Sequence, residues 1–176
     1  MVEPPERTEL DETRITSESR LFAVDLFARF PELRRHSAME RIEGEETWIL
    51  VVTVPAASGD PRSDLSIWVD GGDDPSVMFG DWHTHENVWG AGLEDGAERT
   101  ALLDLIAGIL ADRFVMCEEV GGAGDGFGTI LDLSEHDALL EELTSPGSPG
   151  RARLRSWSGR LDREVALEDL ERDKPA

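Results

Sequence analysis

The side chains best suited to chemistry lie in one short run, residues 79–89, which holds two of the four histidines and two of the five tryptophans. His83 and His85 are two positions apart. Side chains alternate along a β-strand, so this spacing directs both imidazoles to one side. Histidine pairs at this spacing are common zinc ligands. If one strand continues through this run, Asp81 shares the histidine face and Trp82 lies on the opposite face.

The chemistry of that run depends on ligands from elsewhere. Asp81 can be a third ligand or can orient an imidazole, and Glu86 can activate a metal-bound water. A closed zinc site needs four protein ligands and a catalytic one usually three. Other acids can complete the set, but the sequence does not place them: Glu45, Glu46, Asp95 and Glu118. The alternative is that these histidines and tryptophans pack and hydrogen-bond where a strand meets a loop. No catalytic residue is assigned, and the predicted cofactor is none, with zinc at His83 and His85 as the alternative.

The charge is the strongest global signal, with 38 acidic and 17 basic residues among 176 and a formal net charge of −21. Such a surface repels nucleic acid and anionic membranes, which need clustered positive charge. It suits a basic protein partner, because acidic surface steers such an encounter. Trp82 and Trp89 are then the expected anchors, since aromatic residues dominate binding hot spots, with Asp81 and Glu86 beside them. A polar N-terminus and the absence of a long apolar run predict a cytoplasmic protein.

The hydrophobic pattern predicts a single α+β domain over residues 17–143, preceded by a flexible acidic arm at residues 1–16. Thr16 or Ser17 can cap the first helix, and Pro31 should kink or divide it. The apolar stripe of this helix is expected to face the core: Phe22, Leu26, Phe30 and Leu33, widened by Leu21 and Val24.

Later elements follow from alternating or continuous apolar runs. They predict strands at 47–54, 65–69, 77–85, 114–117 and 127–133, with a helix at 94–111 between the third and the fourth. The element order is therefore α-βββ-α-ββ-α, with an antiparallel sheet of about five strands and the helices on one face.

The composition changes near the C-terminus. Residues 144–150 are rich in Ser, Pro and Gly and predict a linker. Residues 151–176 predict an amphipathic C-terminal helix, with its stripe at Leu154, Trp157, Leu161 and Val165. This helix can fold back on the acidic body, pair in a homodimer or bind another molecule.

Residues 80–85 resemble part of the JAMM metalloprotease motif, over about 15 residues of the chain. The resemblance implies zinc held by His83, His85 and a downstream aspartate, a distant glutamate that activates water, and cleavage of isopeptide bonds. Three positions depart from the family pattern: Glu86 replaces a proline, Leu93 a serine, and Gly96 the aspartate, with Asp95 one residue early.

A longer stretch, residues 65–133, resembles a group of small acidic bacterial proteins that includes immunity proteins of polymorphic-toxin systems. That resemblance implies a single-domain, non-enzymatic binding role. The element order also resembles that of type III secretion chaperones, which are acidic dimeric α+β proteins. The sequence thus predicts an immunity-like or chaperone-like protein that binds a basic partner. The alternative is a zinc-dependent hydrolase of the JAMM type that uses His83 and His85.

Overall fold

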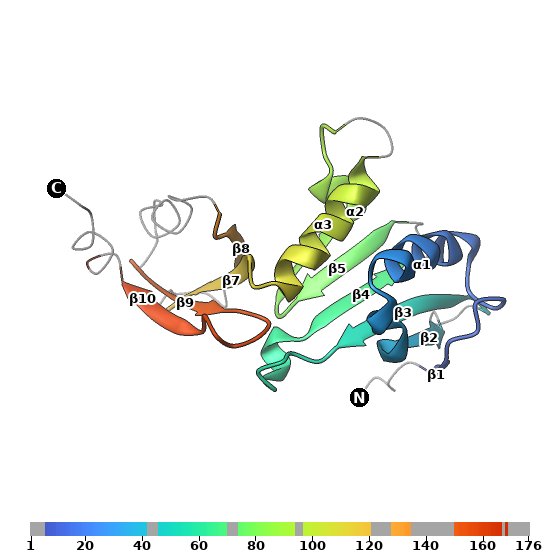
Figure 1. Cartoon of the computed structure of the whole chain (residues 1–176), viewed down its shortest axis with the longest axis horizontal. Helices are drawn as coiled ribbons and strands as arrows, with labels where there is room; N and C mark the ends of the chain where they lie inside the picture. Colours follow the sequence, from blue (N-terminus) through green and yellow to red (C-terminus); the bar gives the residue numbers. More distant parts are fainter. Residues whose placement is uncertain are drawn as a thin grey trace. The chain divides into compact units, whose positions relative to one another are not determined.

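The computed structural model describes residues 6–41, 46–69, 74–93, 97–120, 128–134, 150–166 and 168 (Figure 1). The chain forms two compact units where the sequence predicted one domain. The first unit comprises Met1–Val54, Leu65–Met78 and His83–Asp104, and the second comprises Pro55–Asp64, Phe79–Trp82 and Leu105–Ala176. Each unit joins segments that are far apart in the chain, and periodicity within a short window does not reveal such pairing.

Helix α1 (Ser17–Arg29) begins and ends where the sequence signals lie. Thr16 is the N-cap, and its hydroxyl accepts a hydrogen bond of 3.1 Å from the Ser19 N–H. Pro31 opens the 3-10 helix η1 (Pro31–His36), so the predicted break is confirmed. The predicted stripe is buried at its four main positions, but Leu21 and Val24 are 62% and 61% exposed. The expectation that these two residues widen the core stripe is wrong.

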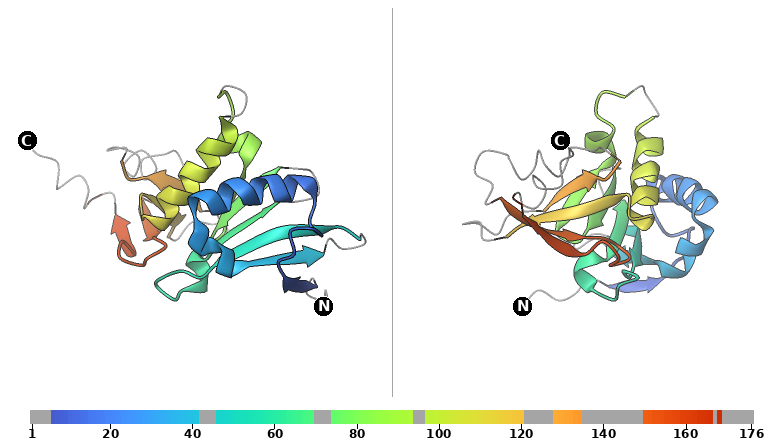
Figure 2. Two further views of the ribbon diagram at one scale, coloured as in Figure 1. Left: turned by 45° about the vertical axis from the view of Figure 1, so that its right-hand side comes forward. Right: turned by 60° about the vertical axis from the view of Figure 1, so that its left-hand side comes forward.

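The first sheet has six strands in the order β1-β2-β3-β4-β5-β6. They are Arg7–Glu9, Ser37–Arg41, Trp48–Val54, Leu65–Val69, Pro75–Phe79 and Trp82–His85. The central strand β3 pairs antiparallel with β2 and with β4, aligning Leu50 with Met39 and Val52 with Ile67. Figures 1 and 2 show α1 lying over one face of β3 and β4. Phe22 and Leu26 of α1, like Leu50 and Ile67, are fully buried, which places the core of the first unit at this face.

Strands β1 and β2 correct the prediction for the N-terminal part of the chain. β1 pairs antiparallel with β2, and Thr8 lies opposite Met39. Ile15, later in the predicted arm, is buried. Residues 7–9 of the predicted flexible arm therefore belong to the sheet. All three are exposed, so they show no alternation of apolar and polar side chains that would predict a strand.

The second sheet has four strands in the order β10-β9-β7-β8. They are Arg163–Ala166, Arg151–Arg155, Phe114–Glu119 and Thr129–Asp132. The right-hand view of Figure 2 shows β9 and β10 as a red hairpin beside β7. A cluster of buried side chains forms the core beneath this sheet: Val115, Cys117, Leu131, Ala152, Leu154 and Val165.

The amphipathic helix predicted for residues 151–176 is wrong where the structure describes the chain, because β9 and β10 lie there. In β9, the buried Ala152 and Leu154 alternate with Arg151 and Arg153, which is the period of a strand. Hydrogen bonding to β7 satisfies the backbone N–H and C=O groups of β9. This pairing favours the strand period over the helical period in residues 151–155.

The remaining elements are the 3-10 helix η2 (Pro61–Ser63), the short helix α2 (Glu86–Trp89) and α3 (Glu98–Leu110). The fold is a mixed α+β arrangement with antiparallel sheets, as predicted, but the single five-stranded sheet is wrong. Predicted features in residues 94–96, 121–127 and 135–149, including most of the linker, lie outside the described residues. None of the described helices is long and apolar enough to cross a membrane.

Candidate functional site

The predicted third strand is in fact a hairpin, with β5 and β6 joined by Gly80 and Asp81. Gly80 has φ of 59°, in the left-handed region that glycine adopts at little cost. A Cβ here would lie 2.5 Å from the Arg62 carbonyl oxygen and 2.5 Å from the Met116 methyl group. Glycine is therefore required at this position for two reasons: the positive φ angle and the lack of room for a Cβ atom. Gly followed by another residue between two strands is also the sequence signal of a two-residue hairpin.

The reversal at Gly80 changes which side chains share a face. Val77 and Phe79 are fully buried, whereas Asp81 and His83 are exposed. One strand continuing through residues 77–85, as predicted, would put Val77 and Phe79 on the same face as Asp81 and His83. That prediction is wrong, because the period of two does not continue through a turn. The tip of the hairpin, Phe79–Trp82, belongs to the second unit, and the rest of the run belongs to the first.

His85 is tied to the neighbouring strand. Its Nδ1 lies 2.7 Å from the hydroxyl oxygen of Ser76, and each residue lies four positions from the turn. A serine and a histidine at this distance match the geometry of a nucleophile and its base. Ser76 is completely buried, however, and its hydroxyl also contacts the Asp74 carbonyl at 3.3 Å. The pair therefore stabilises the hairpin and does not present a nucleophile to substrate.

The two histidines do not form a complete metal site in the part of the chain that the structure describes. Their ring centroids are 5.9 Å apart and the ring planes are nearly perpendicular, at 88°. Among the described residues, no three His, Cys, Asp or Glu side chains gather closely enough to hold a metal ion. Asp95 and Glu45, two of the further candidate ligands, lie outside those residues. Two imidazoles alone do not meet the ligand requirement of zinc, and the zinc hydrolase stays a prediction of the sequence.

Glu86, the candidate base, is engaged by an arginine. Its Oε2 accepts a hydrogen bond of 3.3 Å from Nε of Arg99 on α3. Burial raises the pKa of Glu86, and the Arg99 charge partly opposes this rise. Asp74 accepts a hydrogen bond of 3.3 Å from the Asn87 N–H, at the beginning of α2. These contacts anchor α2 to the rest of the first unit.

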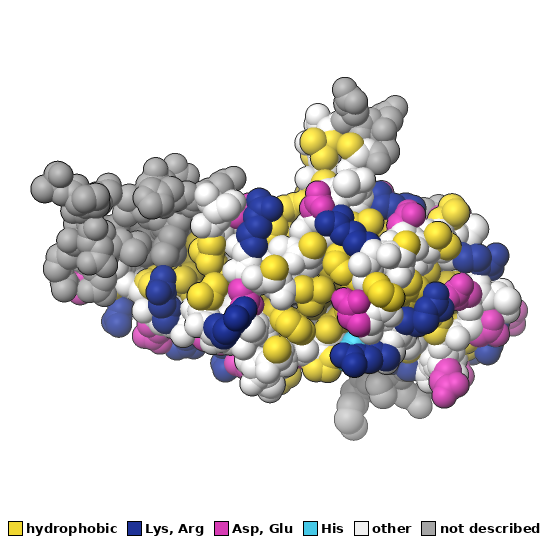
Figure 3. Space-filling view, viewed as in Figure 1, with side chains coloured by type: hydrophobic (Ala, Val, Ile, Leu, Met, Phe, Trp, Pro, Cys, Tyr) yellow, Lys and Arg dark blue, Asp and Glu magenta, His cyan; other side chains and the backbone are white. Residues whose placement is uncertain are grey.

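Helix α2 and the turn after it expose apolar side chains. Val88 is 63% exposed and Leu93 is 48% exposed, while Trp89 between them is partly buried. Figure 3 shows hydrophobic side chains on the turn that follows α2. Sequence reasoning selected Trp82 and Trp89 and missed Val88 and Leu93. Periodicity cannot identify them, because a four-residue helix is too short to show a stripe.

The same part of the chain carries no positive charge over a long stretch. Residues 63–98 contain nine acidic residues and neither lysine nor arginine. The first cation after this stretch, Arg99, forms ion pairs with Glu86 and Asp25. Val88 in α2 and Leu93 in the turn after it therefore lie in a strongly acidic segment.

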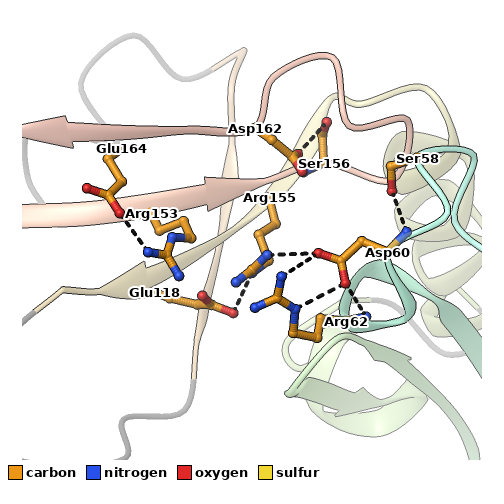
Figure 4. A network of polar contacts seen from close by, with 9 residues as sticks. All are labelled: Ser58, Asp60, Arg62, Glu118, Arg153, Arg155, Ser156, Asp162 and Glu164. Atoms are coloured by element: carbon orange, nitrogen blue, oxygen red, sulfur yellow. Dashed lines mark hydrogen bonds and ion pairs between the residues drawn. The ribbon is translucent and has the colours of Figure 1, made fainter.

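A second polar cluster lies in the second unit (Figure 4). Arg155 on β9 has a side chain only 6% exposed, and it donates to Glu118 at 2.8 Å and to Asp60 at 3.1 Å. Asp60 also accepts two hydrogen bonds from the Arg62 side chain, which chiefly hold its pKa at about 2. The cluster joins β9, β7 and the loop at residues 55–64, and its pairs are internally satisfied. Its role is therefore structural.

Comparison of the chain with family models, with curated proteins and with solved structures gave no match.

Proposed function

We propose that this chain is a non-enzymatic, acidic, cytoplasmic binding protein, immunity-like or chaperone-like, that recognises a basic protein partner. We place the contact at a surface called here the α2 surface, formed by Asp74, Glu86, Val88, Trp89 and Leu93. The observation that carries the proposal is the exposure of Val88 and Leu93 within a segment of nine acids and no positive charge.

The two kinds of side chain in this surface have different roles in binding. Acidic groups attract a basic partner from a distance and raise the rate of encounter. Exposed apolar groups leave water only when a partner covers them, which contributes about 25 cal/mol for each Å² of apolar surface. Trp89, already partly buried and therefore held in place, loses little side-chain freedom on binding and is the expected anchor. Trp82 belongs to the other unit and is not part of the α2 surface.

The test begins with capture of proteins from native lysate by the immobilised full-length chain at about 0.1 M salt. At this concentration electrostatic attraction still extends roughly 10 Å. A basic protein retained there and released near 1 M salt is then purified, and its dissociation constant is measured by calorimetry. If no basic protein is retained at low salt, the proposal is wrong.

Matched variants locate the contact. Val88→Ser with Leu93→Ser should weaken binding by about 10- to 100-fold, since two apolar side chains no longer contribute at the interface. Leu21→Ser with Val24→Ser alters two side chains of similar exposure on α1 and should leave the constant unchanged. Equal affinities for the two double variants would contradict the α2 surface as the contact.

A further inference from the structure

Helix α1 carries a second exposed apolar feature, on the side away from the core. Leu21, Val24 and Ala28 are exposed and follow the spacing i, i+3, i+7. At about 100° per residue they fall within roughly 60° of one another around the helix axis. The buried Phe22 and Leu26 point to the opposite side of the same helix. The three exposed residues therefore form a narrow apolar ridge that no described element covers.

A groove lies beside this ridge, within the first unit. It has a volume of about 460 Å³ and is lined by Asp25, Ala28, Arg29, Arg99, Thr100 and Leu103. Ala28 belongs to both features, so the ridge and the groove are continuous. Leu103 and Ala28 contribute its apolar surface, and the charged residues surround them.

The charges around the groove are balanced. Arg29 pairs with Asp104 at 2.5 Å, and Arg99 pairs with Asp25 at 3.4 Å. Figure 3 shows hydrophobic, basic and acidic side chains intermixed over α1. Two copies of a chain with a net charge of −21 repel each other over most of their surfaces. The ridge and groove form a locally neutral surface at which that repulsion is weakest.

We propose that the ridge and groove of the first unit form an isologous interface with a second copy of this chain. Under two-fold symmetry the same surface serves both partners, so the ridge of each copy enters the groove of the other. With the two-fold axis perpendicular to α1, the symmetry also reverses the direction of α1 in the partner copy. Asp25 of one copy can therefore lie opposite Arg29 of the other copy, so that unlike charges meet.

Charge distinguishes a second copy from other occupants. A basic partner gains little at this groove, because Asp25 is already paired with Arg99 and Asp104 with Arg29. A strongly acidic partner would be repelled by the chain as a whole. A second copy supplies both signs in equal number at this surface. The inference does not depend on the proposed function, which uses the α2 surface.

Sedimentation velocity of the full chain over a range of concentrations tests the interface. We expect a monomer–dimer equilibrium in which the dimer fraction rises from about 0.1 M to about 1 M salt, because salt screens the repulsion between the two acidic chains. The salt effect on the basic partner has the opposite sign, so the two proposals fail independently. A chain that stays monomeric at every concentration and salt level overturns the interface.

Two double variants place the dimer contact. Leu21→Glu with Val24→Glu puts charges into the ridge and should raise the dimer dissociation constant at least about 100-fold. Val88→Ser with Leu93→Ser should leave it unchanged. Circular dichroism confirms the fold of each variant, and Leu21→Ser with Val24→Ser provides a milder change if the glutamates disturb α1. A dimer that survives both ridge variants overturns the proposal.

Discussion

Replacing Gly80 by alanine tests how the hairpin that carries the histidines is held. A non-glycine residue in the left-handed region costs about 1 kcal/mol relative to glycine. The added Cβ would also lie 2.5 Å from the Arg62 carbonyl oxygen, which is backbone and moves only with the loop at residues 55–64. Overpacking of this kind costs typically about 1–3 kcal/mol. The sum is a loss of about 2–4 kcal/mol in the free energy of unfolding.

The matched control is Gly59→Ala in the same unit. Gly59 has φ of 77°, and apart from its two chain neighbours no described residue has an atom within 4 Å of the point that an added Cβ would occupy. It therefore carries the backbone cost of about 1 kcal/mol without the clash. Urea unfolding followed by circular dichroism gives both losses. If Gly80→Ala costs no more than Gly59→Ala, the close approach of Arg62 and Met116 does not constrain the turn, and the reasoning is refuted.

Two further changes test the second unit. Arg155→Met leaves Glu118 without its arginine, removes one of the two arginines that bond Asp60, and should lower the unfolding free energy by about 3 kcal/mol. Arg153→Met, at a half-exposed ion pair, should cost less than about 1 kcal/mol. Equal losses in urea unfolding would show that burial does not strengthen the Arg155 cluster. Asp132→Asn should cost about 1 kcal/mol at pH 7. Hydrogen bonding from Arg113 holds the folded-state pKa of Asp132 at about 2, below the ordinary value of 3.8, so the stability it contributes is present above pH 4 and is lost as the pH falls through 2. The unfolding free energies of the wild type and of Asp132→Asn should therefore converge at low pH. If the difference in unfolding free energy persists at pH 2, the ion pair with Arg113 is not the source of that difference.

The sequence predicted those elements whose signals are local. Thr16 caps α1 and Pro31 ends it, because one side chain and one missing N–H act within a single turn. Strands β3 and β4 lie where continuous and alternating apolar runs predicted them. These features need no information from distant residues.

The C-terminal segment shows where local signals are insufficient. Leu154, Trp157, Leu161 and Val165 fit a helical period, yet β9 and β10 form there. Gly159 has φ of 76° within the connecting turn, where Asp162 accepts hydrogen bonds from Ser156. The partner that makes β9 a strand is β7, more than 30 residues earlier. Only tertiary pairing distinguishes the two periods.

For the candidate site, the sequence alone determined where to look, and the tertiary structure decided what is available there. Residues 79–89 were selected for their histidines and tryptophans, and the acidic character of that part of the chain is visible without a structure. The reversal at Gly80 buries Val77 and exposes His83, and the contact with Ser76 engages His85. Exposure of Val88 also follows from packing, because which face of a short helix meets solvent depends on the elements beneath it. Residue types thus indicate the available chemistry, while accessibility is a property of the folded chain.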